Sequence, residues 1–133
     1  MFLVRLLYCS VPNGIGDDGI AGILDVSHAN NALDDITGVL VYNGCYFLQC
    51  LEGGRRAVSK RFTAIAADKR HKDLEILDFS PIAERRFPAW TMQYVGGTDL
   101  DQGIVSTYTT GQFDPRRMIF PEAIVDMLWR LAQ

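Results

Sequence analysis

The dipeptide Asn43-Gly44 constrains this chain more than any other short feature, because it is the strongest local signal for a tight β-hairpin. Two runs rich in β-branched and aromatic residues flank it, at 38–42 and 45–52. The sequence therefore predicts two antiparallel strands joined at this dipeptide.

A two-residue turn would pair Tyr42 with Cys45. The same register sets Gly38 opposite Gln49 on one face of the sheet, since facing residues move in step along both strands. An amide beside a residue without a side chain predicts a gap next to a polar anchor, and such a gap favours a bound planar molecule.

Apolar periodicity predicts the other elements of the first 97 residues. The expected strands are 2–9, 74–79 and 90–95, and the expected helices are 17–31 and 54–70. On the last strand, Trp90, Met92 and Tyr94 would share one face. The order βαββαββ predicts an α+β, ferredoxin-like sandwich, a five-stranded mixed sheet with both helices on one face.

The C-terminal part has a different pattern and predicts two further helices, at 98–108 and 121–132. The second has its apolar residues on one side, and these helices would cover the other sheet face, which carries Leu7 and Leu48. We therefore expect a domain at 1–97 and a helical extension at 98–133.

Composition excludes several classes of protein. The formal net charge is −3 and the basic residues form no stripe, which argues against a nucleic-acid partner. No apolar run approaches the roughly 20 residues that span a bilayer, and the N-terminus lacks a leader peptide, so a cytoplasmic location is expected. Three cysteines, without metal spacing, are interpreted as buried reduced thiols: Cys9, Cys45 and Cys50.

The first helix changes character along its inward stripe, which runs Ile20, Ile23, Leu24, Ser27 and Asn31. The stripe begins apolar and ends polar. A helix that only fills a core has no use for polar residues on its buried side, so this pattern indicates a helix that lines a polar ligand.

Enzyme signatures are largely absent: there is no glycine-rich phosphate loop, no nucleophile elbow and no metal spacing between the two histidines. What remains is a set of aromatic, amide and thioether residues: Tyr8, Asn30, Asn31, Gln49, Trp90 and Met92. For each one alone, core filling or a satisfied buried polar group is the better explanation.

Together these residues fall within five segments that occur in order. They are VRLLYCS at 4–10, NN at 30–31 followed by ITG at 36–38, FLQCLEG at 47–53, DKRH at 68–71, and RFPAWTM at 86–92. Over residues 2–97 the chain resembles the BLUF family, sensors of blue light that use flavin adenine dinucleotide (FAD). The tail resembles the short stand-alone members with two C-terminal helices.

The resemblance implies a flavin ring between the two helices of the domain. It implies a flavin-binding set of Tyr8, Ser27, Asn30, Asn31, Gln49, Asp68, Arg70 and His71. Within it, Asn31 would bind the carbonyl and imide edge of the ring, and Arg70 and His71 would lie near the ribityl and phosphate end. Ala64 departs from the family, where a basic residue is frequent, so FMN or riboflavin could replace FAD in part.

The resemblance also implies a photoactive relay of Tyr8, Gln49, Trp90 and Met92. An electron and a proton would leave Tyr8 and later return, leaving Gln49 rotated or tautomerised and the absorption shifted to the red. Trp90 or Met92 would lie beside Gln49. Because nothing is consumed, the protein would be a photosensor and not an enzyme, and its signal would pass through self-association and a downstream protein.

Two other functions remain open from the residues alone. One is a small acylphosphatase-like hydrolase, although the loop after Tyr8 lacks the basic residue that such a site needs. The other is a flavin-free ligand-binding or scaffold domain on the same fold, which would have little use for both Tyr8 and Gln49.

Overall fold

The strands and helices follow one another in the predicted order βαββαββ, and helical segments follow them. The computed structural model describes residues 2–97 and 100–133. The bounds are β1 (Leu3–Pro12), α1 (Asp17–Leu33), β2 (Thr37–Tyr42), β3 (Phe47–Gly54), α2 (Arg55–Ala66), β4 (His71–Ile82), β5 (Gln93–Gly96), α3 (Gln102–Tyr108), the 3₁₀ turn η2 (Pro115–Arg117) and α4 (Pro121–Leu131).

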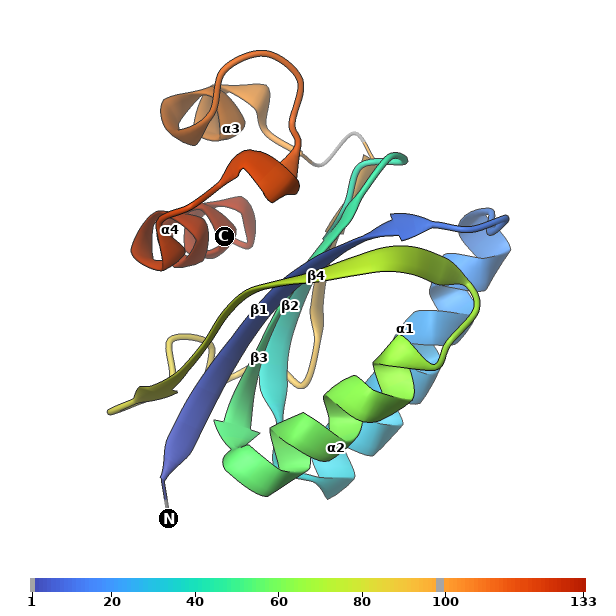
Figure 1. Cartoon of the computed structure of the whole chain (residues 1–133), viewed down its shortest axis with the longest axis vertical. Helices are drawn as coiled ribbons and strands as arrows, with labels where there is room; N and C mark the ends of the chain where they lie inside the picture. Colours follow the sequence, from blue (N-terminus) through green and yellow to red (C-terminus); the bar gives the residue numbers. More distant parts are fainter. Residues whose placement is uncertain (1, 98–99) are drawn as a thin grey trace.

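The strands form one five-stranded sheet in the order β4-β1-β3-β2-β5. The pairs β1–β3, β1–β4 and β2–β3 are antiparallel and β2–β5 is parallel, so the sheet is mixed. Helices α1 and α2 lie on one side of the sheet, and α3 and α4 lie on the other (Figure 1). The α+β, ferredoxin-like fold predicted from the sequence is therefore confirmed.

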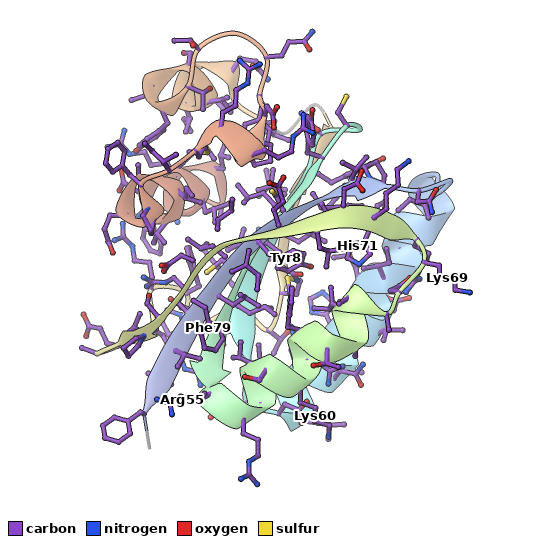
Figure 2. All side chains as sticks on the ribbon, in the orientation of Figure 1. Tyr8, Arg55, Lys60, Lys69, His71 and Phe79 are labelled. Atoms are coloured by element: carbon purple, nitrogen blue, oxygen red, sulfur yellow. The ribbon has the colours of Figure 1, made fainter. Side chains whose placement is uncertain are left out.

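Side-chain alternation along β1 divides the buried residues into two cores. Val4, Leu6 and Tyr8 point to the core under α1 and α2. Leu7 and Cys9 point to the core under the C-terminal helices. On α2, the exposed side of the helix carries charge, with Arg55 and Lys60 pointing away from the sheet (Figure 2).

The predicted register of the first hairpin is wrong by two residues. Tyr42 pairs with Phe47, so four residues connect the strands instead of two. Gly38 consequently faces Leu51, not Gln49. A Cβ at Gly38 would lie 2.1 Å from the backbone oxygen of Cys50, so this glycine permits close approach of two strands and does not mark a gap.

The prediction for the last strand is also corrected. β5 begins at Gln93, so the stretch that carries Trp90 is not a strand and strand alternation does not apply to it. Trp90 packs on the opposite side of the sheet from Met92, in the core under α4. Of the other elements, β4 is longer than expected and α2 ends earlier, at Ala66.

The C-terminal helices cover the second sheet face, as predicted. Ile124 and Leu128 of α4 share a buried cluster with Leu7 of β1 and Leu48 of β3. Residues 98 and 99, where the first of these helices was expected to begin, lie outside the described residues, and α3 begins at Gln102. The division into a domain at 1–97 and an extension at 98–133 stays a prediction.

A buried carboxylate fixes the connection between β4 and β5. Glu52, on β3, is completely buried and pairs with Arg5, whose Nε donates to Oε2 at 2.8 Å. The backbone N–H groups of Arg86 and Phe87 both donate to Oε1 at 2.9 Å. The chain ahead of β5 is therefore attached to the centre of the sheet.

Two smaller expectations concern the cysteines and the membrane. Cys9 and Cys50 are buried, but Cys45 is exposed in the hairpin connection, which corrects the prediction for that thiol. Within the described residues, 2–97 and 100–133, no helix has both the length and the apolar character that crossing a membrane requires.

Candidate functional site

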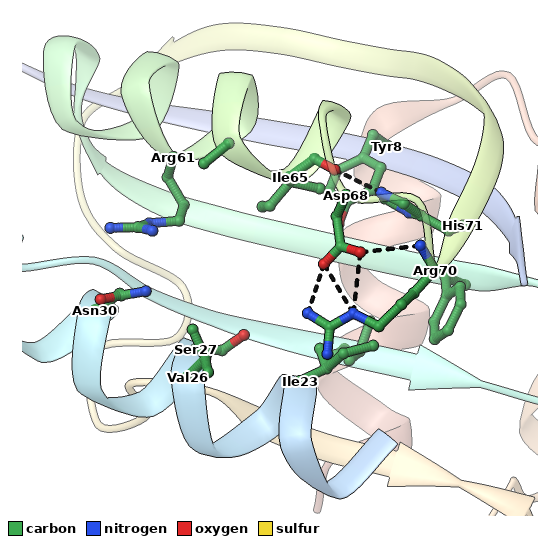
Figure 3. A pocket seen from close by; sticks show the side chains of 13 residues that line it. Tyr8, Ile23, Val26, Ser27, Asn30, Arg61, Ile65, Asp68, Arg70 and His71 are labelled. Carbon is green, nitrogen blue, oxygen red and sulfur yellow. Dashed lines mark hydrogen bonds and ion pairs between the residues drawn. The ribbon is translucent and has the colours of Figure 1, made fainter. Parts of the chain in front are cut away.

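A cavity of about 180 Å³ lies between α1 and α2, above the sheet (Figure 3). Six of the residues predicted to bind flavin line it: Tyr8, Ser27, Asn30, Asp68, Arg70 and His71. They come from β1, α1, the α2–β4 connection and the start of β4, so the fold brings together segments that are distant in the sequence.

Tyr8 connects this cavity to the interior of the sheet. It lies opposite Gln49 in the β1–β3 register, and its hydroxyl donates a hydrogen bond to Gln49 Oε1. Both side chains are buried, with 3% and 4% of their surface exposed. Burial, with a smaller contribution from the charge of Asp68, raises the pKa of Tyr8, so the phenol stays a protonated donor at any ordinary pH.

The amide of Gln49 is used in both directions. While Oε1 accepts from Tyr8, Nε2 donates to the sulfur of Met92 at 3.5 Å. The sequence left open whether Trp90 or Met92 lies beside Gln49, and the structure places Met92 there. Trp90 instead stacks on Phe87, with 6.0 Å between ring centroids, and lies 6.1 Å from Trp129 of α4.

The C-terminal end of α1 contacts the segment that leads to Met92. Asn31 is buried, and its Nδ2 donates to the backbone oxygen of Thr91 at 2.8 Å. His28 binds the Thr91 hydroxyl at 3.0 Å. The Oδ1 atom of Asn31 is a buried acceptor for which the described chain provides no hydrogen-bond donor.

At the other end of the cavity, Asp68 and Arg70 form an ion pair in which Arg70 Nε donates to both carboxylate oxygens at 3.0 Å. The hydrogen bond from Arg70 lowers the pKa of Asp68, which therefore stays ionised at neutral pH. His71 is held at both nitrogens, by Ser10 at 2.8 Å and by the backbone oxygen of Ile65 at 2.6 Å. Because a carbonyl only accepts, Nε2 of His71 carries a hydrogen.

Sequence reasoning missed Arg61, which lies on α2 and lines the cavity one helical turn before Ala64. A signal was present. The inward stripe of α2 consists of Val58, Phe62 and Ile65, and position 61 has the spacing of that stripe. A cation on the apolar side of a helix is costly to bury without a partner, so it marks a polar function.

Comparison with known proteins identifies the family. The family model described as "BLUF: Sensors of blue-light using FAD" matches residues 3–93. This chain belongs to the BLUF family. BLUF proteins are sensors of blue light that use FAD. The matched range includes Tyr8, Gln49 and Met92.

Solved BLUF structures are similar over nearly the whole chain. The dark-state structure of the BLUF protein BlrB is 34% identical, with a TM-score of 0.79, and the match covers 98% of this chain and 94% of that one. The photo-activated state of BlsA is 30% identical, with a TM-score of 0.84 and the same coverage. The C-terminal helices are thus included in the likeness.

Curated relatives are much longer proteins. An alpha-like subunit of photoactivated adenylate cyclase from Euglena gracilis is 33% identical over 114 residues, which is 85% of this chain and 10% of that protein. The blue light- and temperature-regulated antirepressor BluF of Escherichia coli is 37% identical over 70 residues, or 51% of this chain and 17% of that protein. The chain spans at most about a sixth of such relatives.

The residues present fit a flavin. The pyrimidine edge of a flavin ring carries one N–H between two carbonyl groups. Asn31 Oδ1 is a buried acceptor for which the described residues provide no donor, so it matches that N–H; Asn31 itself does not line the cavity, but its neighbour Asn30 does, in a wall that includes Phe47 and Leu40. Ser27 and Asn30 add polar groups along α1.

Proposed function

We propose that this chain is a reversible blue-light switch in which Tyr8, Gln49 and Met92 form the photoactive relay, and that it transmits its signal through protein contacts without net turnover. The observation that supports this is the continuous hydrogen-bonded path from the Tyr8 hydroxyl through the Gln49 amide to the Met92 sulfur. When bound, the flavin absorbs blue light and, once excited, accepts one electron.

Tyr8 is the donor in this proposal. Its phenol gives up an electron, and its hydroxyl proton moves along the existing hydrogen bond to Gln49 Oε1. Both return to Tyr8, so no group is oxidised or reduced at the end of the cycle. A glutamine suits this position because an amide donates and accepts at once, whereas an ionised carboxylate only accepts.

In this proposal the lit state differs from the dark state in the orientation or the tautomer of the Gln49 amide. Rotation of the amide exchanges Oε1 with Nε2, so an oxygen faces Met92 and the bond to the sulfur is lost. Conversion to the imidic acid tautomer would also change the donors that the side chain presents. One neutral hydrogen bond is worth on the order of 1 kcal/mol, which biases a two-state equilibrium by roughly fivefold.

So small a bias needs an element that responds to it, and the segment at 90–92 is suited to that role. Met92 contacts Gln49 on one side of the sheet, while Trp90 packs against Trp129 of α4 on the other. A change at Gln49 therefore reaches the C-terminal helices within three residues. We propose that their outer surface makes the light-dependent contact, with a second copy or a downstream protein.

We further propose that FAD is the natural flavin and that FMN or riboflavin can replace it in part, since Ala64 lines the cavity at a position where relatives often have a basic residue. Arg70 and His71 would serve the ribityl and phosphate end. We also propose the cytoplasmic location that is expected from the sequence.

An absorption spectrum of the purified protein tests the proposal directly. We expect flavin bands that shift slightly to longer wavelength under blue light and recover in darkness with no added reductant. Protein that carries no flavin after reconstitution with FAD would support a scaffold domain instead. Bands that bleach under light, in place of shifting, would show net photoreduction and would contradict the reversible relay.

A further inference from the structure

Arg61 is a cation in the wall of the cavity that no role described so far requires. It projects from α2 and lines the same cavity as Asn30 of α1. Figure 3 shows Arg61 and Asn30 near one end of the space between the helices, with Asp68 and Arg70 near the other. Arg61 is thus separated from the charged pair at the ribityl end.

Its guanidinium is only partly satisfied. Nη2 donates to the carboxylate of Asp34 at 2.7 Å, and Asp34 lies immediately after α1. The side chain is 17% exposed, and its Nε–H is a buried donor that finds no acceptor in the described residues. A buried donor without an acceptor costs roughly 1–3 kcal/mol, so a ligand that supplies an oxygen there gains affinity.

Asn31 presents the complementary deficiency at the same end of α1. Among the residues that the structure describes, its Oδ1 finds no donor, whereas Arg61 Nε finds no acceptor. The pyrimidine edge of a flavin alternates carbonyl, N–H and carbonyl, so it supplies both. We propose that Arg61 binds a carbonyl of the flavin ring through Nε–H and places a positive charge beside that edge, an inference that rests on the proposed flavin function.

The charge has a consequence that a neutral donor would lack. Reduction of a flavin adds electron density to the N1 and C2 carbonyl region, and a cation beside it binds the reduced ring more tightly than the oxidised ring. Asp34 holds the guanidinium and offsets part of its charge, since the two are in contact at 2.7 Å. Arg61 is therefore a positioning and tuning residue for the ring.

Arg61 could instead contact the phosphates of FAD. Binding of riboflavin distinguishes the two roles, because riboflavin has no phosphate. We would titrate apoprotein with riboflavin and with FAD by fluorescence, anaerobically in the dark, before and after dithionite reduction. The variants are R61Q and R61K, with R56Q as the matched control, because Arg56 is an exposed residue of the same helix.

For R61Q we expect about tenfold weaker binding of oxidised riboflavin and of oxidised FAD, because each loses the same charged hydrogen bond. Binding of the reduced flavins should weaken by about a further tenfold, since the charge is lost as well. R61K keeps the charge, so its ratio of reduced to oxidised affinity should stay near that of the unsubstituted protein. R56Q should change neither quantity.

Weakened FAD binding with unchanged riboflavin binding would overturn the inference and assign Arg61 to the phosphates. Identical behaviour of R61Q and R56Q would also overturn it. Failure of the unsubstituted protein to bind any flavin is a separate result, which contradicts the proposed function itself.

Discussion

Gln49 on β3 donates its amide Nε2–H to the sulfur of Met92 at 3.5 Å. The two residues are 43 positions apart, and β2 lies between β3, which carries Gln49, and β5, which begins just after Met92. This contact orients the amide, because a thioether accepts and cannot donate, so Oε1 is left to accept from Tyr8. The Met92 sulfur therefore determines which end of the Gln49 amide donates and which end accepts.

The first prediction concerns the phenol. Replacement Y8F removes the only hydroxyl on the path and should keep flavin bound while abolishing the light-induced red shift, as measured by difference absorption spectroscopy. Y108F is the matched control, because Tyr108 donates to Asp126 in the C-terminal helices, and that variant should shift normally. A normal shift in Y8F would refute the donor role of Tyr8.

Gln49 gives a second prediction. Q49L fills a similar volume but has no donor or acceptor, so it should bind flavin and show no red shift. Because Tyr8 then has a buried hydroxyl without its acceptor, we expect a loss of about 1–3 kcal/mol in the free energy of unfolding. Urea titration measures that loss, and a persistent red shift would show that the amide is not the switch.

Met92 and Trp90 should have different effects when replaced. M92L keeps the volume and removes the acceptor for Gln49 Nε2, so the dark state loses a hydrogen bond and dark recovery should slow by roughly fivefold. W90F should leave recovery within about twofold and lower the free energy of unfolding by about 1 kcal/mol, because Trp90 packs on Phe87 and Trp129. The reverse assignment of effects would show that Trp90 is the residue beside the amide.

The buried pair of Arg5 and Glu52 predicts a large loss of stability. E52Q keeps the shape of the side chain but leaves the Arg5 cation without a counter-ion, which should cost about 3–5 kcal/mol in urea unfolding. The control is D35N, because Asp35 pairs with Arg85 at 3.3 Å but is 93% exposed, and its loss should change little. Equal effects would mean that burial of the Glu52 charge is not decisive.

Cys9 predicts the behaviour of stability at high pH. Burial, with the nearby charge of Glu75 contributing next, raises the pKa of its thiol from 9.0 to about 11. Between these values the unfolded chain releases a proton that the folded chain keeps, so the free energy of unfolding should fall as the pH rises from 9 to 11. In C9A that slope should be shallower, and an unchanged slope would show that Cys9 does not contribute.

The sequence was sufficient wherever structure is encoded by residues near one another along the chain. The helical spacing of Ile124, Met127, Leu128 and Leu131 predicts α4, and all four are buried. The change from apolar to polar along α1 predicts a helix that lines a ligand; Ser27 lines the cavity, whereas Asn31 is buried and does not line it. The resemblance to the family likewise assigns Tyr8 and Gln49 to one relay, and the two side chains share a hydrogen bond.

Those local patterns do not predict which residues pair between strands. The Asn43-Gly44 signal marks the hairpin correctly, but Asn43 Oδ1 accepts from the backbone N–H groups of Cys45 and Tyr46, and this longer connection moves the register by two residues. Because the shift is even, Gln49 keeps its face and changes only its partners.

By itself the sequence determined the order of strands and helices and the faces of β1, α1 and α4, because each depends on local spacing and residue chemistry; the set of flavin-binding residues came from the resemblance to the family and stays a prediction. Only the tertiary structure decided that Met92, not Trp90, contacts Gln49, and that Arg61 lines the cavity with a buried N–H for which the described residues provide no acceptor. The physical reason is that Trp90 precedes β5, so the alternation of side chains along a strand does not determine its side of the sheet. Instead Trp90 packs against Trp129, on the side of the sheet opposite Met92.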